Sequence, residues 1–389
     1  MVDVEGVLQP YYDRLLADVG PLDLFDAHTH IGANDPDGFR QTPEQLLRAL
    51  ARAGARGVVF PMHEPDGYRA ANDAVIEAAA ASGGRMVPYC RVNPHDGALA
   101  EATRALDAGA RGIKLHPRAE RFGLGEPGVR DVVALAHERG LPVLIHAGRG
   151  IPALGQHTVA LSGEFPRAKL ILAHAAISDL AWLWRVMPEH PNLFFDTAWW
   201  NPSDLIALFT LAPPSQILWA SDSPYGLPVM SALMALRCAT QAGLPMDALR
   251  SIAGRQLERI LEGRAPADAG APRGEARALD PLLERLVTHL VSAMARAFAR
   301  SEPDESVALA RLACAVGEDS PHAPVFAAVL DLLDRWAEHR HEPAPDGRPI
   351  PPAGRFIVTA LVIARTPDVP LPERTQAPPP TRGEAERAA

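Results

Sequence analysis

Five polar side chains follow short apolar runs in this sequence, and their residue types suit metal binding and proton transfer. His28 and His30 end the first of these runs. The others end later runs and are His146, His174 and Asp222. Imidazole nitrogens and carboxylate oxygens bind Zn²⁺ well, and the same donors accept Mn²⁺, Fe²⁺ or Co²⁺. The residue types therefore favour a divalent metal site if the fold brings them together.

The spacing of His28 and His30 has a geometric meaning if the first run is a β-strand. Side chains at positions i and i+2 of a strand point to the same face, so both imidazoles can bind one ion. His146 and Asp222 would complete a set of nitrogen and oxygen ligands. Water bound to such a metal loses a proton near neutral pH, and Asp222 can serve as the general base. This pattern predicts chemistry through metal-bound hydroxide.

Eight apolar runs with the spacing of repeated βα units would position these residues. Successive runs begin 23 to 32 residues apart, which is the size of one βα unit. Most runs are apolar throughout, as in strands that are buried on both faces. The pattern predicts an α/β fold, a (β/α)₈ TIM barrel with a C-terminal helical extension, whose strand ends meet at one face. The runs begin at Leu24, Arg56, Arg85, Arg111, Pro142, Lys169, Leu193 and Gln216.

The chain is predicted to divide into a barrel and a C-terminal extension. We expect the barrel over residues 1–263, a linker rich in Ala, Pro and Gly at 264–275, and a small helical module at 276–341. The Pro-rich remainder, 342–389, is expected to be largely disordered. Arg355 to Arg365 is the exception, because it is apolar enough to dock as a strand or a helix. The expected helices of the module are Pro281 to Arg300, Asp304 to Val316 and Ala323 to Arg340.

Several segments resemble those of the amidohydrolase-related family, in the branch that contains aminocarboxymuconate-semialdehyde decarboxylase, γ-resorcylate decarboxylase and related hydrolases. The resemblance extends over roughly residues 22–263. It implies a barrel with a metal on His28, His30, His146 and Asp222. It also implies that His174 is a catalytic residue that orients or deprotonates water, or protonates the substrate. The segments that carry it are FDAHTHIG, GIKLHP, VLIHAG, LILAHA and LWASDSPYG.

Lys114, His116 and Arg149 are the candidates for binding the substrate. Lys114 ends the fourth run, where superfamily members with two metals carry a bridging lysine carbamate. We expect Lys114 and His116 to contact an anionic substrate instead; the carbamate, or a buried ion pair of Lys114 with Asp196 or Asp26, is an alternative. Arg149 lies in the loop after the fifth run, and its planar guanidinium suits a carboxylate. A solvent-facing arginine is an equally good interpretation of that position.

Other residues that follow the runs are candidates for the wall of the pocket. Asp196 ends the seventh run and can orient a metal-bound histidine. Trp199 and Trp200 come next, and they either line the substrate site or pack against neighbouring loops. The loop at 32–41 is rich in Gly and Asp, which is typical of a mobile lid and also of a plain surface loop.

The composition restricts the classes of function. Lys and Arg number 38 against 47 Asp and Glu, a net charge of −9, which argues against a nucleic-acid binder. The apolar run Phe356 to Ala364 is too short to span a membrane. Met1 to Leu15 lacks the apolar core of a secretory signal, and the scattered cysteines suggest buried reduced thiols. We therefore expect a cytoplasmic protein that acts on a small molecule.

These observations lead to one main hypothesis, a metal-dependent hydrolase that acts on a small carboxylated or cyclic substrate. Zn²⁺ is the expected metal, with Mn²⁺ as an alternative. Asp222 would take the proton of the attacking water, and His174 would stabilise the developing oxyanion. A nonoxidative decarboxylase with the same metal site and a non-catalytic metal-binding scaffold are the alternatives. By its resemblance to the family, the chain is expected to assemble as a homodimer if it assembles at all.

Overall fold

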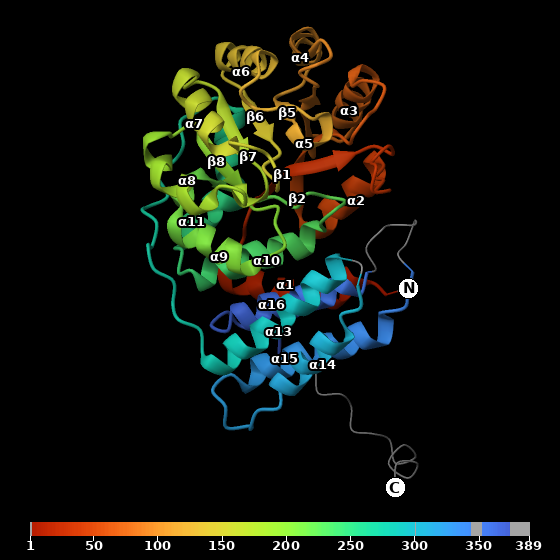
Figure 1. Ribbon diagram of the computed structural model, residues 1–389, viewed down its shortest axis with the longest axis vertical. Coiled ribbons are helices and arrows are strands. Elements are labelled where there is room, and N and C mark those ends of the chain that lie inside the picture. Colours follow the sequence, from red (N-terminus) through yellow and green to blue (C-terminus); the bar gives the residue numbers. More distant parts are fainter. Residues whose placement is uncertain (1, 300, 344–351, 374–389) are drawn as a thin grey trace.

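The computed structural model describes residues 2–299, 301–343 and 352–373, and its main body is a parallel β-barrel surrounded by helices (Figure 1). The strands pair in chain order, in one sheet of β1 to β3 and another of β4 to β9, and every pair is parallel. The strands are β1 (Leu24–Ile31), β2 (Ala55–Pro61), β3 (Met86–Pro88), β4 (Cys90–Arg91), β5 (Ile113–Leu115), β6 (Pro142–Ile145), β7 (Lys169–Leu172), β8 (Leu193–Asp196) and β9 (Ile217–Leu218).

The strands β3 and β4 are two parts of one barrel strand that is interrupted at Tyr89. The backbone N–H of Tyr89 still donates to Val59 of β2 at 2.8 Å, whereas that of Cys90 donates to Gly112, just before β5, at 3.0 Å. The interruption therefore divides the hydrogen bonding between two neighbours without opening the wall.

The wall closes where the last strand meets the first. The backbone N–H of Ala27 in β1 donates to the carbonyl of Trp219 at 3.0 Å, and that of His30 donates to Ser223 at 2.8 Å. These bonds join both sheets into one cylinder, in which β3 and β4 count as a single strand. The (β/α)₈ barrel predicted from the spacing of the apolar runs is confirmed.

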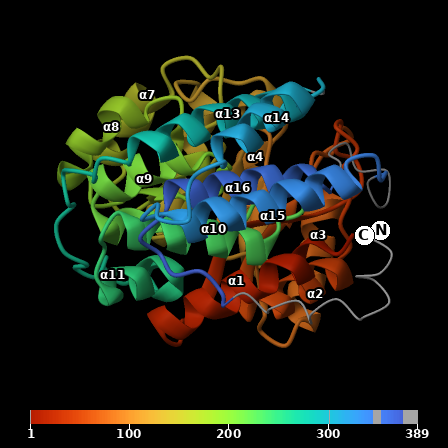
Figure 2. The ribbon, with the colours of Figure 1, turned by 90° about the horizontal axis from the view of Figure 1, so that it is seen from below.

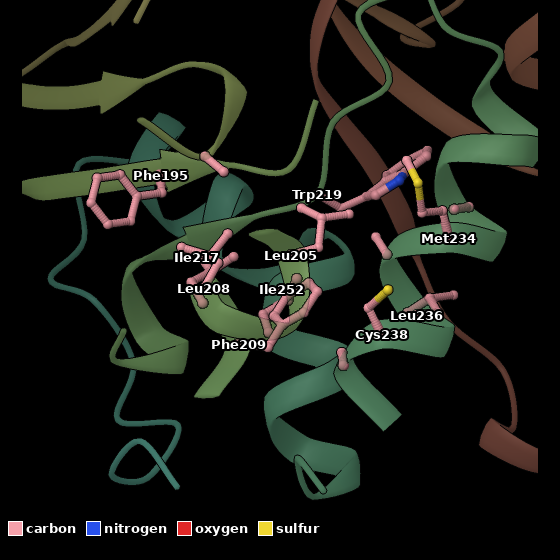
Figure 3. Close-up of a cluster of buried hydrophobic side chains, with 14 of the residues drawn as sticks. Phe195, Leu205, Leu208, Phe209, Ile217, Trp219, Met234, Leu236, Cys238 and Ile252 are labelled. Atoms are coloured by element: carbon pink, nitrogen blue, oxygen red, sulfur yellow. The ribbon is translucent and has the colours of Figure 1, made fainter. Parts of the chain in front are cut away.

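Neighbouring residues of each strand alternate between two separate cores. In β9 and just after it, Leu218 and Ala220 face the packed interior of the barrel. Ile217 and Trp219 face outward and join the core between the barrel and its helices. Figure 3 shows Trp219 among side chains of this outer core, close to Met234. Burial on both faces explains why the strands read as nearly continuous apolar runs.

Helices alternate with the strands, and local capping interactions mark where they begin and end. Thr42 caps α2 in a reciprocal capping box with Gln45, and Gly54 ends this helix in the left-handed conformation, at φ 68°. An additional helix, α1 (Val4–Val19), precedes the barrel and packs on α10. The helices around the barrel are α2 (Pro43–Ala53), α3 (Arg69–Ala81), α4 (Ala98–Asp107), α5 (Pro117–Glu120), α6 (Pro127–Arg139), α7 (Leu154–Glu164), α8 (Leu180–Val186), α9 (Pro202–Leu211), α10 (Pro228–Gln241), α11 (Met246–Arg250) and α12 (Gln256–Leu261).

The C-terminal helices form a layer against one side of the barrel, over α9 and α10 (Figures 1 and 2). Residues 264–280 connect the two parts without helix or strand. Among the described residues, no helix is long and apolar enough to cross a membrane. The layer contains α13 (Pro281–Phe298), α14 (Asp304–Ala313), α15 (Ala323–His339) and α16 (Gly354–Arg365).

The segment that the sequence left open between strand and helix is the central helix of this layer. In α16 every residue from Phe356 to Ala364 is buried, because α13, α15 and α10 all pack on it. A helix that is apolar all round is stable only in such a position. The described segment continues to residue 373, and the remaining parts of the predicted disordered tail, 344–351 and 374–389, lie outside the described residues.

A single buried arginine joins the end of this segment to the barrel helices. Arg237 of α10 is fully buried and donates to the hydroxyl and the carbonyl of Thr366, both at 2.9 Å. Its guanidinium also donates to the carbonyls of Val369 at 3.1 Å and Pro370 at 2.9 Å. The planar guanidinium thus satisfies oxygens that lie just beyond the end of α16, where no helical N–H can reach them.

Candidate active site

Three of the predicted metal ligands meet at the carboxyl ends of β1 and β9. Asp222 Oδ1 lies 3.1 Å from His28 Nε2 and 3.0 Å from His30 Nε2. One ligand atom from each of the three residues lies within 4.8 Å of the others. The two histidines share a face because they are two residues apart on a strand, as predicted. Asp222 joins them because β9 closes the barrel against β1.

The chemistry of these three residues fits a bound divalent cation. His28 Nδ1 lies 2.8 Å from Asp196 Oδ2, and in the tautomer that donates to this carboxylate, Nε2 carries a lone pair. Burial keeps the pKa of His28 and His30 well below the usual value, so both rings are neutral. A lone pair that faces a carboxylate oxygen at 3.1 Å is repulsive unless a cation lies between them. With Nδ1 donating to Asp196, His28 has the tautomer that a metal ligand needs.

Asp196 fixes two histidines of the site at once. Its Oδ1 accepts from the backbone N–H of His174 at 2.8 Å and from that of Ala198 at 2.9 Å, while its Oδ2 accepts from His28. It is fully buried at the end of β8. The contact with His28 is the one predicted for Asp196 from the sequence. This carboxylate helps to set the orientation of His28 and His174.

The backbone is strained at two of the residues singled out from the sequence. His174 and Asp222 both have φ 58°, in the left-handed region that residues other than glycine rarely adopt. The ring of His174 is held by a hydrogen bond from Nδ1 to the carbonyl of Ala198 at 2.7 Å, and Nδ1 lies 4.0 Å from Asp222 Oδ2. Such strain gathers at functional sites, where the surrounding structure enforces it. Both residues therefore remain the strongest candidates for proton transfer.

His146 lies beside the three ligands but outside their group. Its ring stacks on His116, with ring centres 3.8 Å apart, and its Nδ1 lies 3.0 Å from His174 Nε2. Its Nε2 is buried and has no hydrogen-bond partner among the described residues. A Cβ at Gly148 would approach this nitrogen to 2.5 Å, so only glycine fits there. Ligation by His146 stays a prediction.

The three predicted substrate-binding residues lie in different surroundings. Lys114 is fully buried, with Nζ 3.4 Å from His28 Nε2 and 4.9 Å from the centre of the Phe60 ring. His116 caps the short helix α5 by accepting from the backbone N–H of Ala119 at 3.1 Å. Arg149 is exposed in the turn after β6. The structure thus brings Lys114 and His116 to the histidine cluster, whereas Arg149 is exposed to solvent.

Burial dominates the electrostatics of the barrel mouth. It lowers the pKa of Lys114 to about 7, and raises the pKa of Asp196 and of Asp26 to about 7. The pKa of Asp222 is raised to about 6 for the same reason. Acids and bases are thus brought towards a common pKa, which is the condition for proton transfer near neutral pH.

Sequence reasoning missed a buried ion pair next to the site. Arg91, at the end of β4, donates through Nη2 to Glu120 Oε1 at 2.6 Å, and both side chains are almost fully buried. Tyr68 donates to the same oxygen at 2.5 Å. A charged residue within the apolar run that forms the third barrel strand was the available signal. Its partner Glu120 lies on the short helix α5, which the sequence pattern did not predict.

An apolar chamber opens beside Asp222, between the barrel and the C-terminal helices. Its volume is about 210 Å³. Trp199 and Trp200 line it from the loop after β8, and their contact with a substrate stays a prediction. Phe39, from the loop at 32–41, also lines it and packs on Tyr225 at 4.6 Å. That loop therefore forms part of the wall of the chamber.

A comparison with known families identifies the chain. Residues 25–254, well over half of the sequence, match the profile of the family described as Amidohydrolase. The chain belongs to the amidohydrolase family. The family resemblance inferred from the sequence is thus confirmed, and the chain is an enzyme of a superfamily that uses divalent metals and acts on small molecules. The match ends at residue 254, so the helices α13 to α16 lie outside it.

Solved structures share the barrel at low sequence identity. The 2,6-dihydroxybenzoate decarboxylase from Rhizobium is 15% identical with a TM-score of 0.50, and the match covers 62% of this chain and 99% of that one. The 5-carboxyvanillate decarboxylase LigW from Sphingomonas paucimobilis is 18% identical, with the same coverage and a TM-score of 0.49. A probable 2-pyrone-4,6-dicarboxylic acid hydrolase from Acinetobacter baumannii is 13% identical, covering 62% and 100%, with a TM-score of 0.47. No curated protein is significantly similar in sequence. The likeness to the Rhizobium enzyme, at this low identity, supports the fold alone.

Proposed function

We propose that this chain is a metal-dependent hydrolase of a small carboxylated or cyclic substrate, with Zn²⁺ as its metal. The observation that carries the proposal is the convergence of His28, His30 and Asp222 around Asp222 Oδ1, at 3.0 and 3.1 Å. His146 is proposed as a fourth ligand, since its buried Nε2 lacks a partner among the described residues. A bound divalent cation would polarise a substrate carbonyl and acidify a water molecule.

The protein's own groups are proposed to handle the protons. Asp222, whose pKa burial raises to about 6, accepts a proton from the attacking water. His174, 4.0 Å from Asp222, is held in place by Ala198 and Asp196, and its protonated form would stabilise the charge that develops on the substrate oxygen. Lys114 and His116, which lie against His28 and His146, are proposed to contact an anionic group of the substrate.

A nonoxidative decarboxylase is the second candidate, and the apolar chamber favours it. A carboxylate loses CO₂ more readily where water is excluded, because charge spreads from the carboxylate into the substrate as the bond breaks. The chamber next to Asp222 offers such surroundings. Membership of an enzyme family argues against the third alternative, a non-catalytic scaffold.

Product analysis separates these two reactions. The protein is incubated with a panel of small lactones, amides and aromatic carboxylates, while acid production and CO₂ release are followed in parallel. Hydrolysis predicts acid without CO₂, whereas decarboxylation predicts one CO₂ per substrate consumed. Turnover should disappear after dialysis against a chelator and return with Zn²⁺ or Mn²⁺. Undiminished turnover after complete removal of metal would refute both candidates.

A further inference from the structure

The apolar chamber beside Asp222 has two walls of different origin. One wall comes from the barrel, where Trp199 and Trp200 follow β8 and Met230 lies in the first turn of α10. The other comes from the last turn of α13 and the first turns of α16. The chamber exists only because the C-terminal helices reach the mouth of the barrel.

Direct contacts join these two walls. The ring of Phe298, on the last turn of α13, packs on Trp200 with ring centres 4.7 Å apart. Trp200 in turn packs on Trp199 at 4.9 Å, and the Trp199 ring lies 6.4 Å from that of His174. An unbroken row of rings thus leads from the C-terminal helices to the candidate catalytic histidine.

The chemistry of the lining indicates what the chamber binds. Indole and phenyl rings and the thioethers of Met230, Met234 and Met294 make up most of it, together with Val358. Among the described residues that line it, the charged side chains are Asp222 and Arg355. Surfaces of this kind take up flat apolar groups, since thioethers adapt to a ring and aromatic side chains stack on it. A highly charged substrate would lose hydration here without recovering it.

We propose that α13 and α16 complete the substrate pocket, and that the chamber binds an apolar, ring-bearing part of the substrate while its reacting group lies at Asp222. The C-terminal helices thereby determine specificity and are part of the active site. The inference rests on the proposed function only for the position of the reacting group. Binding of the ring is independent of turnover and is measured separately.

The test compares the binding of two acids by titration calorimetry on the full-length protein, as purified with its metal. The probes are 3-phenylpropionate and propionate, which differ only by the ring. Burial of a phenyl group predicts that phenylpropionate binds about tenfold more tightly, or better. Equal affinities of the two acids would overturn the proposal, whatever the turnover assays give.

Filling the chamber tests its location. Ala297 lines the chamber and is half-buried, so Ala297→Trp adds volume there without removing a packed side chain. We expect this variant to bind phenylpropionate about tenfold more weakly and propionate as before. The matched control is Ala295→Trp, because Ala295 is exposed on the same helix and does not line the chamber. Wild-type affinity for phenylpropionate in Ala297→Trp would contradict the proposal.

A second variant covers the case in which Ala297→Trp does not fold. Phe298 is 40% exposed, so Phe298→Ala leaves the core intact and removes one wall of the chamber. It should weaken phenylpropionate about threefold or more with little change for propionate. Unchanged affinity would again contradict the proposal. If the proposed function is wrong but the pocket proposal is right, the result differs. The protein then shows no metal-dependent turnover but still prefers the ring-bearing acid.

Discussion

The mouth of the barrel buries ionisable side chains, whereas the layer of C-terminal helices buries apolar ones. At the mouth, Asp26, Lys114 and Asp196 are buried together, and burial brings their pKa values to about 7. In the helical layer the central helix α16 is buried through apolar contacts from Phe356 to Ala364. The barrel mouth concentrates groups that are costly to bury, whereas the helices supply apolar area at its edge. Charge is thus buried where chemistry is proposed, and packing supports it from outside.

The largest expected effect comes from changing one oxygen at the mouth. Asp222→Asn keeps the size of the side chain, and Asn tolerates the positive φ of this position, so the fold should be retained. Loss of the carboxylate removes both a ligand and the base, so turnover should fall about a hundredfold to ten-thousandfold. Steady-state kinetics measures the loss, with a substrate that the product analysis has shown to be turned over. Turnover within about threefold of wild type would remove Asp222 from the mechanism.

The corresponding change where the helical layer meets the barrel should affect stability instead. Arg237→Ala removes the guanidinium that satisfies Thr366, Val369 and Pro370, leaving buried oxygens without donors. The free energy of unfolding should fall by about 3 kcal/mol, because each such group loses a charge-assisted hydrogen bond. Urea unfolding measures the change. Arg335→Ala, which removes an exposed arginine on α15, is the control and should be close to neutral.

A smaller effect, on metal affinity, is expected from changing Asp196, the buried acid that contacts His28. Asp196→Asn weakens the hold on His28 Nδ1 and changes the preferred tautomer, so metal affinity should drop about tenfold to a hundredfold. Competition with a chromogenic chelator measures this affinity. The exposed Asp107, on α4, provides the control Asp107→Asn. If both variants bind metal as the wild type does, Asp196 has only a structural role.

The smallest expected effect is a difference in thiol reactivity between the cysteines of the two regions. Burial raises the pKa of Cys90, Cys238 and Cys314 to about 12, so all three thiols should react slowly with a thiol reagent at neutral pH. Cys314, in the helical layer, retains 4% exposure and should react first, ahead of Cys90 in the barrel. Mass spectrometry after timed labelling gives the order. Faster labelling of Cys90 would indicate that the barrel opens before the helices.

The barrel could be predicted because its information is local and repeated. Each strand is a run of apolar residues buried on both faces, and the strand bounds fall close to the predicted starts, as for β1 at Leu24 and β6 at Pro142. The grouping of His28 with His30 follows from strand geometry alone. Asp222 could be added because a closed barrel must bring its last strand to its first.

Features that depend on distant partners could not be predicted. Arg237 forms its hydrogen bonds with residues about 130 positions later, and nothing in the sequence pairs them. The position of α16 depends on its packing against three other helices. The Pro-rich sequence on both sides of it is typical of disorder, so the helix could not be predicted. Likewise, the orientation of His146 is set by His116 and His174, through ring stacking and a hydrogen bond that spacing does not encode.

The central claim is that His28, His30 and Asp222 hold a metal, and elemental analysis of purified protein tests it most directly. Wild type is compared with the His28→Ala, His30→Ala double variant and with His95→Ala, which removes an exposed histidine elsewhere on the barrel. We expect zinc or manganese in the wild type and in His95→Ala, and its loss from the double variant. Equal metal content in all three proteins would contradict the assignment.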